Sequence, residues 1–347
     1  MNSTSNLPLV SIVIPNYNGA RYLEGCLRSL LLQSYSKMEI VVVDNASDDP
    51  SAAIVRAAAP AALLIQQTRN LGFAGGVNAG VRASHGDWIA VLNNDTEADK
   101  NWLAECIRAI QDHPDAAFLA CRVLDFANRE RVYSAGDCYL RAGIGYRRGQ
   151  EQRDGQEFLR ECEIFSASGC AALYRRSVFE EAEGYDENFF AYLEDVDLGL
   201  RLQAAGFRGY YAPEAVVFHH GAGTSGGEFS PLAVRLRTRN ALLLLLKSVP
   251  VGFLARCLPM ILAAQLSWFL RAAAHMQLAS YFTGLSEASR LAPAMIRARA
   301  RLRPHWRDAR REFWQAIVRS ESLARRDFAS NKERSSSLFL KWYFRIF

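Results

Sequence analysis

Short apolar runs alternate with helical patterns over the first part of the chain. Four apolar runs predict buried strands, at 9–14, 38–43, 61–65 and 88–92. Four segments show helical spacing, at 20–32, 50–59, 74–84 and 98–111. Continuous apolar strands separated by helices are typical of a parallel sheet that is covered on both faces. The predicted fold class is therefore α/β with a mostly parallel central sheet, in which the first strand is expected to end at Pro15.

The pattern is less regular further along the chain. Further strands are predicted at 116–123, 169–174, 209–211 and 215–219, and helices at 177–183 and 195–205. Gly206 follows the second of these helices, as expected just beyond a helix C-terminus. Residues 129–160 are rich in Gly and Arg and have no clear period. We interpret them as irregular structure or a hairpin beside the functional site.

Beyond Pro231 the chain becomes rich in leucine. The apolar stretches 241–246 and 257–270 are shorter than the roughly 20 uninterrupted apolar residues that span a bilayer. The residues that interrupt or end them are Lys247, Pro250, Arg256, Pro259 and Arg271. Amphipathic helices lying on a membrane are one interpretation, and a helical cap packed on the catalytic body is the other. We therefore expect a first domain at 1–235 and a basic helical region at 236–347.

Composition excludes several classes of protein. Of 347 residues, 50% are hydrophobic and 22% are charged, which rules out a disordered chain or a collagen-like fibre. None of the seven cysteines lies in a C-x-x-C pair, so a structural zinc site and a disulfide framework are not expected. Reduced cytosolic thiols fit better. Residues 1–8 carry no Lys or Arg, and no signal peptide is expected.

The net charge of +5 is unevenly distributed along the chain. Residues 290–347 hold 15 Lys or Arg and 5 Asp or Glu, so the rest of the chain has a net charge of −5. A basic, aromatic-bearing tail on an acidic body indicates a polyanionic surface next to the tail. Charge alone leaves nucleic acid and anionic lipid open.

Polar groups follow the first two predicted strands. In parallel sheets ligands bind outside the carboxyl ends of the strands. The turn at 15–19 begins with Pro15, Asn16 and Tyr17, which are also ordinary strand-to-helix turn residues. Asp44 ends the second strand, where its carboxylate is suited to accept the N–H of a uracil or thymine ring. One of the two acids that follow, at 48 and 49, is expected to cap the next helix.

Two further segments carry candidate ligand contacts. The glycine-rich stretch 70–80 allows close backbone approach to a ligand and leads into a helix whose N–H groups can face an anion. Its spacing is not that of the dinucleotide-binding fingerprint. Asn93, Asn94 and Asp95 follow the fourth strand, where a carboxylate can hold Mg²⁺ or Mn²⁺ against phosphate oxygens or cap the next helix.

Acids and histidines stand out later in the sequence. Glu194, Asp195 and Asp197 follow a run of aromatic residues, and negative charge is favoured at the start of the helix predicted there. A carboxylate beside an apolar wall can have its pKa raised towards that of a useful base. His219 and His220 end a strand before a glycine-rich loop, a position that favours contact with metal or phosphate.

Taken in order, the segments VSIVIPNYNG, VVVDNASDD, NLGFAGGVNAG, LNNDT, FFAYLEDVDLGLRLQAAGF and HHGAGTS resemble the family 2 glycosyltransferases, and most closely their bacterial rhamnosyltransferases. The resemblance covers residues 9–225 and implies a GT-A fold and an inverting transfer from a nucleotide-sugar. It implies catalytic roles for Glu194 and for Asp195, the general base, and metal ligation by Asp95 and His219. Ten residues are assigned to nucleotide-sugar binding: Pro15, Asn16, Tyr17, Asp44, Asn70, Gly72, Phe73, Asn78, Asn93 and Asn94.

The resemblance also implies the partners. We expect dTDP-L-rhamnose as donor, a saccharide or a polyprenyl-diphosphate-linked saccharide as acceptor, and cell-surface polysaccharide as the product. Alternatives are a UDP-hexose or UDP-galactofuranose donor, a nucleotidyltransferase, and a nucleotide-sugar-binding protein without catalysis. Retention of Asp95, Asp195 and His219 argues against the last.

We expect a cytoplasmic protein, peripheral at the inner face of the bacterial cytoplasmic membrane, that binds no nucleic acid. In this interpretation the basic tail lies against anionic headgroups, at about 1 kcal/mol per basic residue. The tail residues in question are Arg297, Arg299, Arg301, Arg303, Arg307, Arg310 and Arg311, with Trp306 and Trp314 nearby. A solvated basic helix is the alternative.

Overall fold

The computed structural model describes residues 7–221, 227–308, 310–331 and 337–347, with the side chains of 303–310 excepted. The first half of the chain forms β1 (Val10–Asn16), α1 (Ala20–Leu31), β2 (Met38–Asp44), α2 (Ser51–Ala58), β3 (Leu63–Gln66), α3 (Gly72–Arg82), β4 (Trp88–Leu92), β5 (Thr96–Ala98), α4 (Trp102–Asp112) and β6 (Ala116–Asp125). The middle of the chain forms β7 (Val132–Ser134), β8 (Asp137–Leu140), β9 (Ile144–Arg147), η2 (Gln156–Leu159), β10 (Cys162–Ile164), β11 (Ala171–Arg175), α5 (Arg176–Glu181), η3 (Glu187–Phe189), α6 (Glu194–Ala204) and β12 (Arg208–His219). The C-terminal part forms α7 (Pro231–Ser248), α8 (Val251–Ala274), α9 (Leu278–Asp308), α10 (Arg310–Ser330) and α11 (Leu338–Ile346).

The central sheet confirms the predicted fold class. Its order is β10-β12-β6-β11-β4-β1-β2-β3, with β5 on β12 and β7 on β6. Strands β3, β2, β1 and β4 run parallel, as do β6 and β12, while β11 lies antiparallel between β4 and β6. The carboxyl ends of the parallel strands therefore meet at one edge, which is where the polar residues of the sequence were expected.

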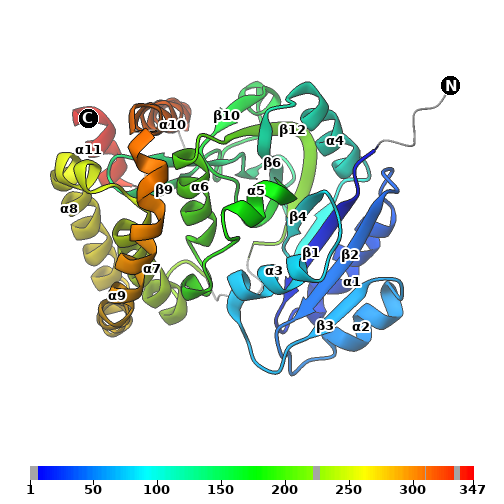
Figure 1. The fold of residues 1–347 in the computed structure, drawn as a ribbon. Helices are drawn as coiled ribbons and strands as arrows, with labels where there is room; N and C mark the ends of the chain where they lie inside the picture. Colours follow the sequence, from blue (N-terminus) through cyan, green and yellow to red (C-terminus); the bar gives the residue numbers. More distant parts are fainter. Residues whose placement is uncertain (1–6, 222–226, 309, 332–336) are drawn as a thin grey trace.

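Helices cover both faces of the sheet (Figure 1), and alternating strand residues supply one apolar layer on each face. Ile12 and Ile14 of β1 pack with α1, α2 and α4 on one face. Val13 faces the opposite way and packs with α3, α5 and α6. Successive side chains of β1 point to opposite faces, and both faces are buried. The sequence of β1 is therefore continuously apolar rather than alternating.

Two details differ from the sequence-based expectations, and a third agrees with one of the two structures expected at 129–160. Pro15 does not end β1, because the pairing of β1 with β4 stops at Val13 and the missing N–H of Pro15 removes no bond on that side. The two strands expected at 209–211 and 215–219 are one strand, β12, whose register with β6 shifts between Ala212 and Val216. The excursion at 129–160 contains the antiparallel hairpin β8–β9.

The C-terminal helices lie beside the sheet, at the end away from β3 (Figure 1). Leu243, Leu244 and Leu245 of α7 pack in one apolar cluster with Val196 and Leu200 of α6. The leucine run at 241–246 is therefore largely part of the protein interior, as the helical-cap interpretation expected for this segment.

Helix α8 corrects part of the expectation about the interrupting residues: Arg256, Pro259 and Arg271 lie inside it, whereas Lys247 and Pro250 do stand where α7 ends and α8 begins. Pro250 stands at its N-cap, and the helix continues through Pro259 for 24 residues. By length and composition it is the one described helix that could cross a membrane, and only 22% of its apolar window is buried. Its exposed leucines follow one another at four-residue spacing: Leu258, Leu262, Leu266 and Leu270.

Part of the basic tail does not face solvent. Arg299 is buried, and its guanidinium donates to the carbonyl oxygens of Leu246, at 2.8 Å, and Val249. Trp314 is half-buried against Phe253. The expectation that Arg299 touches lipid headgroups is therefore wrong, whereas Trp314 stays partly exposed. Arg297, Arg301 and Arg311 are exposed, whereas the side chains of Arg303, Trp306, Arg307 and Arg310 lie outside the described residues.

Candidate active site

The ends of β1, β2 and β4 bring three predicted residues into one buried cluster. Asn16 and Asp44 are register partners on adjacent strands, and the Asn16 amide nitrogen lies 3.4 Å from Asp44 Oδ1. The Asn94 amide donates to Asn16 Oδ1 at 2.6 Å. Ser47, which we had not singled out from the sequence, bonds the same Asp44 oxygen through its hydroxyl. Asp44 is therefore held in a fixed orientation at the edge of the sheet.

Two further predicted binding residues and the predicted helix cap lie around this cluster. Pro15 is buried directly before Asn16, and Tyr17 is half-buried directly after it. Asp49, rather than Asp48, supplies the predicted cap, since its Oδ1 accepts from Ser51 N at 3.1 Å at the start of α2. Its other oxygen accepts from Ala20 N at 2.9 Å, which fixes the start of α1 as well.

The glycine-rich segment contacts the chain that precedes α6. Gly72 has φ +73°, and a Cβ there would lie 2.4 Å from Phe190 O. Asn70 Oδ1 accepts from the Gly72 N–H at 2.8 Å and shapes the turn. The Phe73 ring packs on Gly169, where an added Cβ would lie 3.0 Å from the ring. Glycine is required at position 72 by both its backbone conformation and this close approach.

Asn78 lies apart from the Asn16–Asp44 cluster. It sits within α3, where its amide nitrogen donates to Tyr185 O at 2.8 Å and to Glu187 Oε1 at 3.1 Å. Its amide oxygen accepts from Tyr185 N at 3.1 Å. The N–H groups and the oxygen of this amide are thus bonded within the protein. Contact between Asn78 and a nucleotide-sugar would require these bonds to break.

Asp95 and His219 meet although they are far apart in sequence. His219 Nε2 lies 3.1 Å from Asp95 Oδ1 and 3.4 Å from the amide nitrogen of Asn93. The pairing of Thr96 with His219 between β5 and β12 sets this contact. The ring edge of Tyr133, a residue that we had not singled out, packs on the imidazole at a centroid distance of 4.2 Å. Within the described part of the chain, no three His, Cys, Asp or Glu side chains gather as a metal site.

Glu194 and Asp195 form the first turn of α6. Asp195 Oδ2 accepts from the Gly169 N–H at 3.0 Å, and Oδ1 accepts from the Val196 N–H at 2.8 Å. Burial raises the pKa of Asp195. Burial, followed by the charge of Asp195, raises the pKa of Glu194 well above its ordinary value. The two neighbouring carboxyls therefore influence each other's ionisation, and burial disfavours the charged form of both.

A short chain of contacts joins the acidic pair to the Asp95–His219 pair. Gly169, which holds Asp195, is followed by Cys170, whose carbonyl accepts from Asn93 N at 2.9 Å. Asn93 in turn lies beside His219. The start of α6 and the residue that follows β4 therefore bond the same short stretch, 169–170, which leads into β11, and His219 at the end of β12 adjoins it through Asn93.

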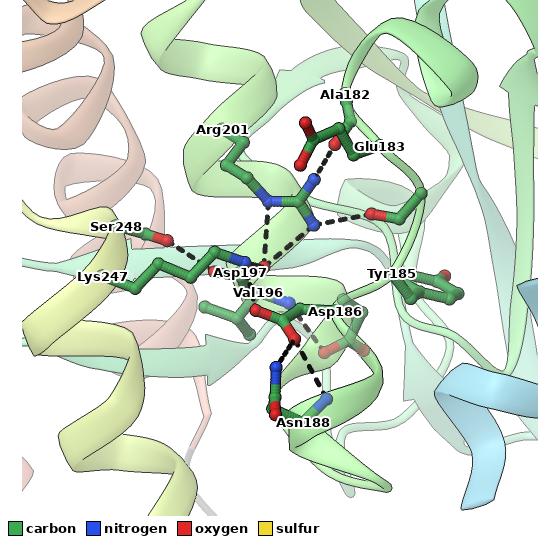
Figure 2. Close-up of polar contacts among 12 residues, drawn as sticks. Ala182, Glu183, Tyr185, Asp186, Asn188, Val196, Asp197, Arg201, Lys247 and Ser248 are labelled. Atoms are coloured by element: carbon green, nitrogen blue, oxygen red, sulfur yellow. Dashed lines mark hydrogen bonds and ion pairs between the residues drawn. The ribbon is translucent and has the colours of Figure 1, made fainter. Parts of the chain in front are cut away.

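Asp197, the third acid of the cluster, belongs to an ion-pair network (Figure 2). Its Oδ2 lies 2.8 Å from Lys247 Nζ and 2.9 Å from Arg201 Nε, and its Oδ1 accepts from Ser248 Oγ at 2.5 Å. Lys247 also pairs with Asp186 at 2.8 Å. The four-residue spacing of Asp197 and Arg201 on a helix would have predicted the ion pair between these two residues. Nothing local in the sequence pointed to Lys247.

The chain is similar to known proteins in two ways: to a family and a relative by sequence, and to solved structures by fold. The family model described as "Glycosyl transferase family 2" matches residues 11–182. N-acetylglucosaminyl-diphospho-decaprenol L-rhamnosyltransferase of Mycobacterium tuberculosis (strain ATCC 25618 / H37Rv) is 31% identical over 246 residues, which are 64% of this chain and 78% of that protein. Among solved structures, S. aureus TarS 1-349 in complex with UDP-GlcNAc has a TM-score of 0.54 at 16% identity, over 88% of this chain and 92% of that one. The mannosyltransferase PcManGT from Pyrobaculum calidifontis, in complex with GDP-Man and Mn²⁺, has a TM-score of 0.51 at 20% identity, over 94% and 88%.

Proposed function

The chain belongs to glycosyltransferase family 2, in its rhamnosyltransferase-like branch, and we propose that it transfers L-rhamnose from dTDP-L-rhamnose with inversion. The proposed acceptor is a saccharide on a polyprenyl diphosphate, for which the support is the name of the mycobacterial relative, N-acetylglucosaminyl-diphospho-decaprenol L-rhamnosyltransferase. The solved neighbours hold UDP-GlcNAc and GDP-Man, so a nucleotide-sugar donor is common to this fold.

The observation that carries the proposal is the convergence of three kinds of group at one edge of the sheet. Asp44 is oriented by Asn16 at the ends of β2 and β1, as base recognition requires. Asp95 and His219 pair beyond the end of β4. Asp195 is held by the stretch that leads into β11. A nucleotide, a diphosphate and an acceptor hydroxyl can therefore lie in series along one edge.

The donor set of Asp95 and His219 fits a divalent cation of the Mg²⁺ or Mn²⁺ type. One carboxylate, one imidazole and no third acidic or sulfur ligand among the described residues leave most of the coordination to substrate phosphates and water, as these cations favour. His219 Nδ1 is buried and makes no hydrogen bond within the described residues. When bound, the cation supplies positive charge that stabilises the departing diphosphate.

Asp195 is the proposed general base. Its raised pKa brings it nearer to the pH at which a base both ionises and accepts a proton efficiently. The acceptor oxygen attacks the anomeric carbon from the face opposite the diphosphate, through an oxocarbenium-like state. A C–O bond forms as the bond to the diphosphate oxygen breaks, the electron pair leaves with the diphosphate, and the hydroxyl proton passes to Asp195.

The test of this proposal is Asp195→Asn. We expect the variant to bind nucleoside diphosphate-sugar with unchanged affinity by calorimetry and to lose transfer by at least about 100-fold, since general-base catalysis supplies about 10²–10⁴-fold. In the wild type, kcat/KM should fall on acidification at a pH above the ordinary carboxyl range, because the base form of Asp195 is lost there. A thermal-shift panel of nucleotide-sugars with and without Mn²⁺ identifies the donor beforehand.

Two results would contradict the assignment of these residues. Near-normal turnover in Asp195→Asn would remove it as the base. Unchanged nucleotide affinity with Mn²⁺ in Asp95→Ala would remove that residue as a cation ligand. Asp112→Asn is the matched control, because Asp112 is exposed on α4 and pairs only with Arg108 among the described residues.

The same proposal places the protein on the cytoplasmic face of a bacterial membrane, where such an acceptor is held. The exposed leucine row of α8 and the exposed arginines Arg297, Arg301 and Arg311 support this placement. The leucines at 258, 262, 266 and 270 lie on one face of the helix because a four-residue spacing returns to nearly the same side. We propose that α8 lies on the membrane with this face buried among the lipids.

A further inference from the structure

The backbone just before the proposed base has an unusual conformation. Three non-glycine residues between η3 and α6 lie in the left-handed region, with φ of 63° at Phe190, 71° at Tyr192 and 68° at Leu193. Leu193 is the N-cap residue of α6, and its side chain makes no capping hydrogen bond. Such conformations persist only where the surrounding structure enforces them, and they cluster at functional sites. The sequence of this segment therefore does not itself fix the start of α6.

One side chain of α7 holds this segment. Asn240 is fully buried, and its amide nitrogen donates to the carbonyl oxygens of Phe189 at 2.9 Å, Ala191 at 2.8 Å and Tyr192 at 2.7 Å. Arg239 donates to Phe189 O at 2.7 Å and to Asn240 Oδ1 at 2.8 Å, which orients the amide. Helix α7 thus brings into its own hydrogen-bond network the carbonyl of Tyr192, which is itself left-handed, and the carbonyls of Phe189 and Ala191, which flank the left-handed Phe190.

The segment 189–193 lies between the glycine-rich segment that begins α3 and the acidic pair that begins α6. The carbonyl of Phe190 accepts from Ala74 N at 3.1 Å, and the residue fills the space that a side chain at Gly72 would need. Four residues beyond Phe190, Glu194 and Asp195 begin α6. A shift of the segment would therefore move the base relative to the glycine-rich donor loop.

We propose that Asn240 is a positioning residue, which sets the place of Asp195 by holding the carbonyls of the segment 189–192. The inference rests on the proposed function, because it concerns the chemistry of the proposed site. It gives α7, which lies outside the residues 11–182 matched by the family model, a part in that chemistry. Lys247, two turns further along α7, pairs with Asp197 and secures the next turn of α6. Helix α7 thus holds α6 on both sides of the acidic pair.

The experiment compares Asn240→Ala with Thr238→Val. Thr238 is an equally buried polar residue of α7 that bonds only Val234 O and Trp268 Nε1 among the described residues, and it does not touch the segment. For Asn240→Ala we expect kcat to fall about 100-fold while nucleotide-sugar affinity by calorimetry stays within about twofold, since a displacement of about 1 Å costs that much. Thr238→Val should keep the wild-type kcat at a temperature at which both variants are folded.

Amide hydrogen exchange supplies a readout that does not depend on turnover. The segment 189–197 should lose protection in Asn240→Ala and keep it in Thr238→Val. Should Asn240→Ala prove too unstable to purify, Arg239→Lys weakens the same hold and should show a smaller loss of kcat with the same unchanged affinity.

The outcomes separate the two proposals. Absence of transfer by the wild type with every nucleotide-sugar would overturn the proposed function. Wild-type transfer together with an unchanged kcat per folded molecule of Asn240→Ala would overturn the positioning role alone. So would an equal fall of kcat in Thr238→Val, or loss of nucleotide-sugar affinity along with kcat.

Discussion

Lys247 compensates two buried carboxylates, and its replacement by Met isolates that role. Lys247 Nζ lies 2.8 Å from an oxygen of Asp186 and 2.8 Å from an oxygen of Asp197, which is fully buried. Figure 2 shows Lys247 beside these two acids. Met keeps most of the aliphatic stem and its packing but removes the charge. Arg201 remains beside Asp197 in the variant, whereas the carboxylate of Asp186 keeps, among the described residues, only its hydrogen bonds from Asn188.

Two estimates give the size of the effect. Removing one partner of a buried ion pair costs about 3–5 kcal/mol. The pKa of Asp197 is lowered from 3.8 to about 2; the charges of Arg201 and Lys247 outweigh the opposing effect of burial. That shift corresponds to about 2 kcal/mol of stability, which the two cations share. Since Arg201 stays and Asp186 is also left without its cation, we expect Lys247→Met to lower the free energy of unfolding by about 3 kcal/mol.

Urea denaturation as a function of pH tests this reasoning. The folded-state pKa values of Asp186 and Asp197 are lowered, so their contribution is present above the ordinary carboxyl pKa and is lost as pH falls from about 4 towards 2. The difference between wild type and variant should be full at pH 7 and shrink below pH 4. Lys341→Met, at an exposed position on α11, is the control and should change stability by under about 0.5 kcal/mol. A loss below 1 kcal/mol at pH 7, or a difference that stays constant down to pH 3, would refute the estimate.

Two further predictions concern the backbone and the surface. Gly72→Ala places a Cβ 2.4 Å from Phe190 O at φ +73°, so it should lower the free energy of unfolding by about 1–3 kcal/mol in urea denaturation, whereas Gly252→Ala, with open space around it, should not destabilise. Equal stability of the two variants would contradict the first. Leu262→Glu with Leu266→Glu replaces two leucines that are each 58% exposed, and should weaken flotation with anionic liposomes at least about tenfold.

The control for the liposome prediction is Leu32→Glu. Leu32 is 73% exposed beyond the end of α1, remote in sequence from the leucine row of α8. It should leave flotation unchanged. Equal flotation of the α8 double variant and the wild type would rule out this face as the membrane contact.

The local pattern of the sequence was enough for the sheet and for one half of the site. The run WIAVL predicted β4 at 88–92 with its observed bounds, because five consecutive apolar residues between polar turns fit only a buried element. Asn16, Asp44 and Asn94 were predicted to lie at one edge because they end or follow strands of a parallel sheet, and the family resemblance assigned all three to nucleotide-sugar binding. The structure brings them into contact. The positions of β4 and of these three residues depend only on residues within one element and on a general rule of sheet geometry.

The sequence did not indicate the contacts that tie α7 to the rest of the site. Asn240 bonds carbonyls 48–51 residues earlier, and Lys247 pairs with Asp197 50 residues earlier. Whether a polar side chain faces solvent, lipid or a buried carbonyl depends on the path of the chain around it, as the burial of Arg299 shows. Local periodicity therefore determined which elements form and which groups end them. Only the packing of distant elements decided which charges are neutralised, which backbone strain is supported and which apolar face remains exposed.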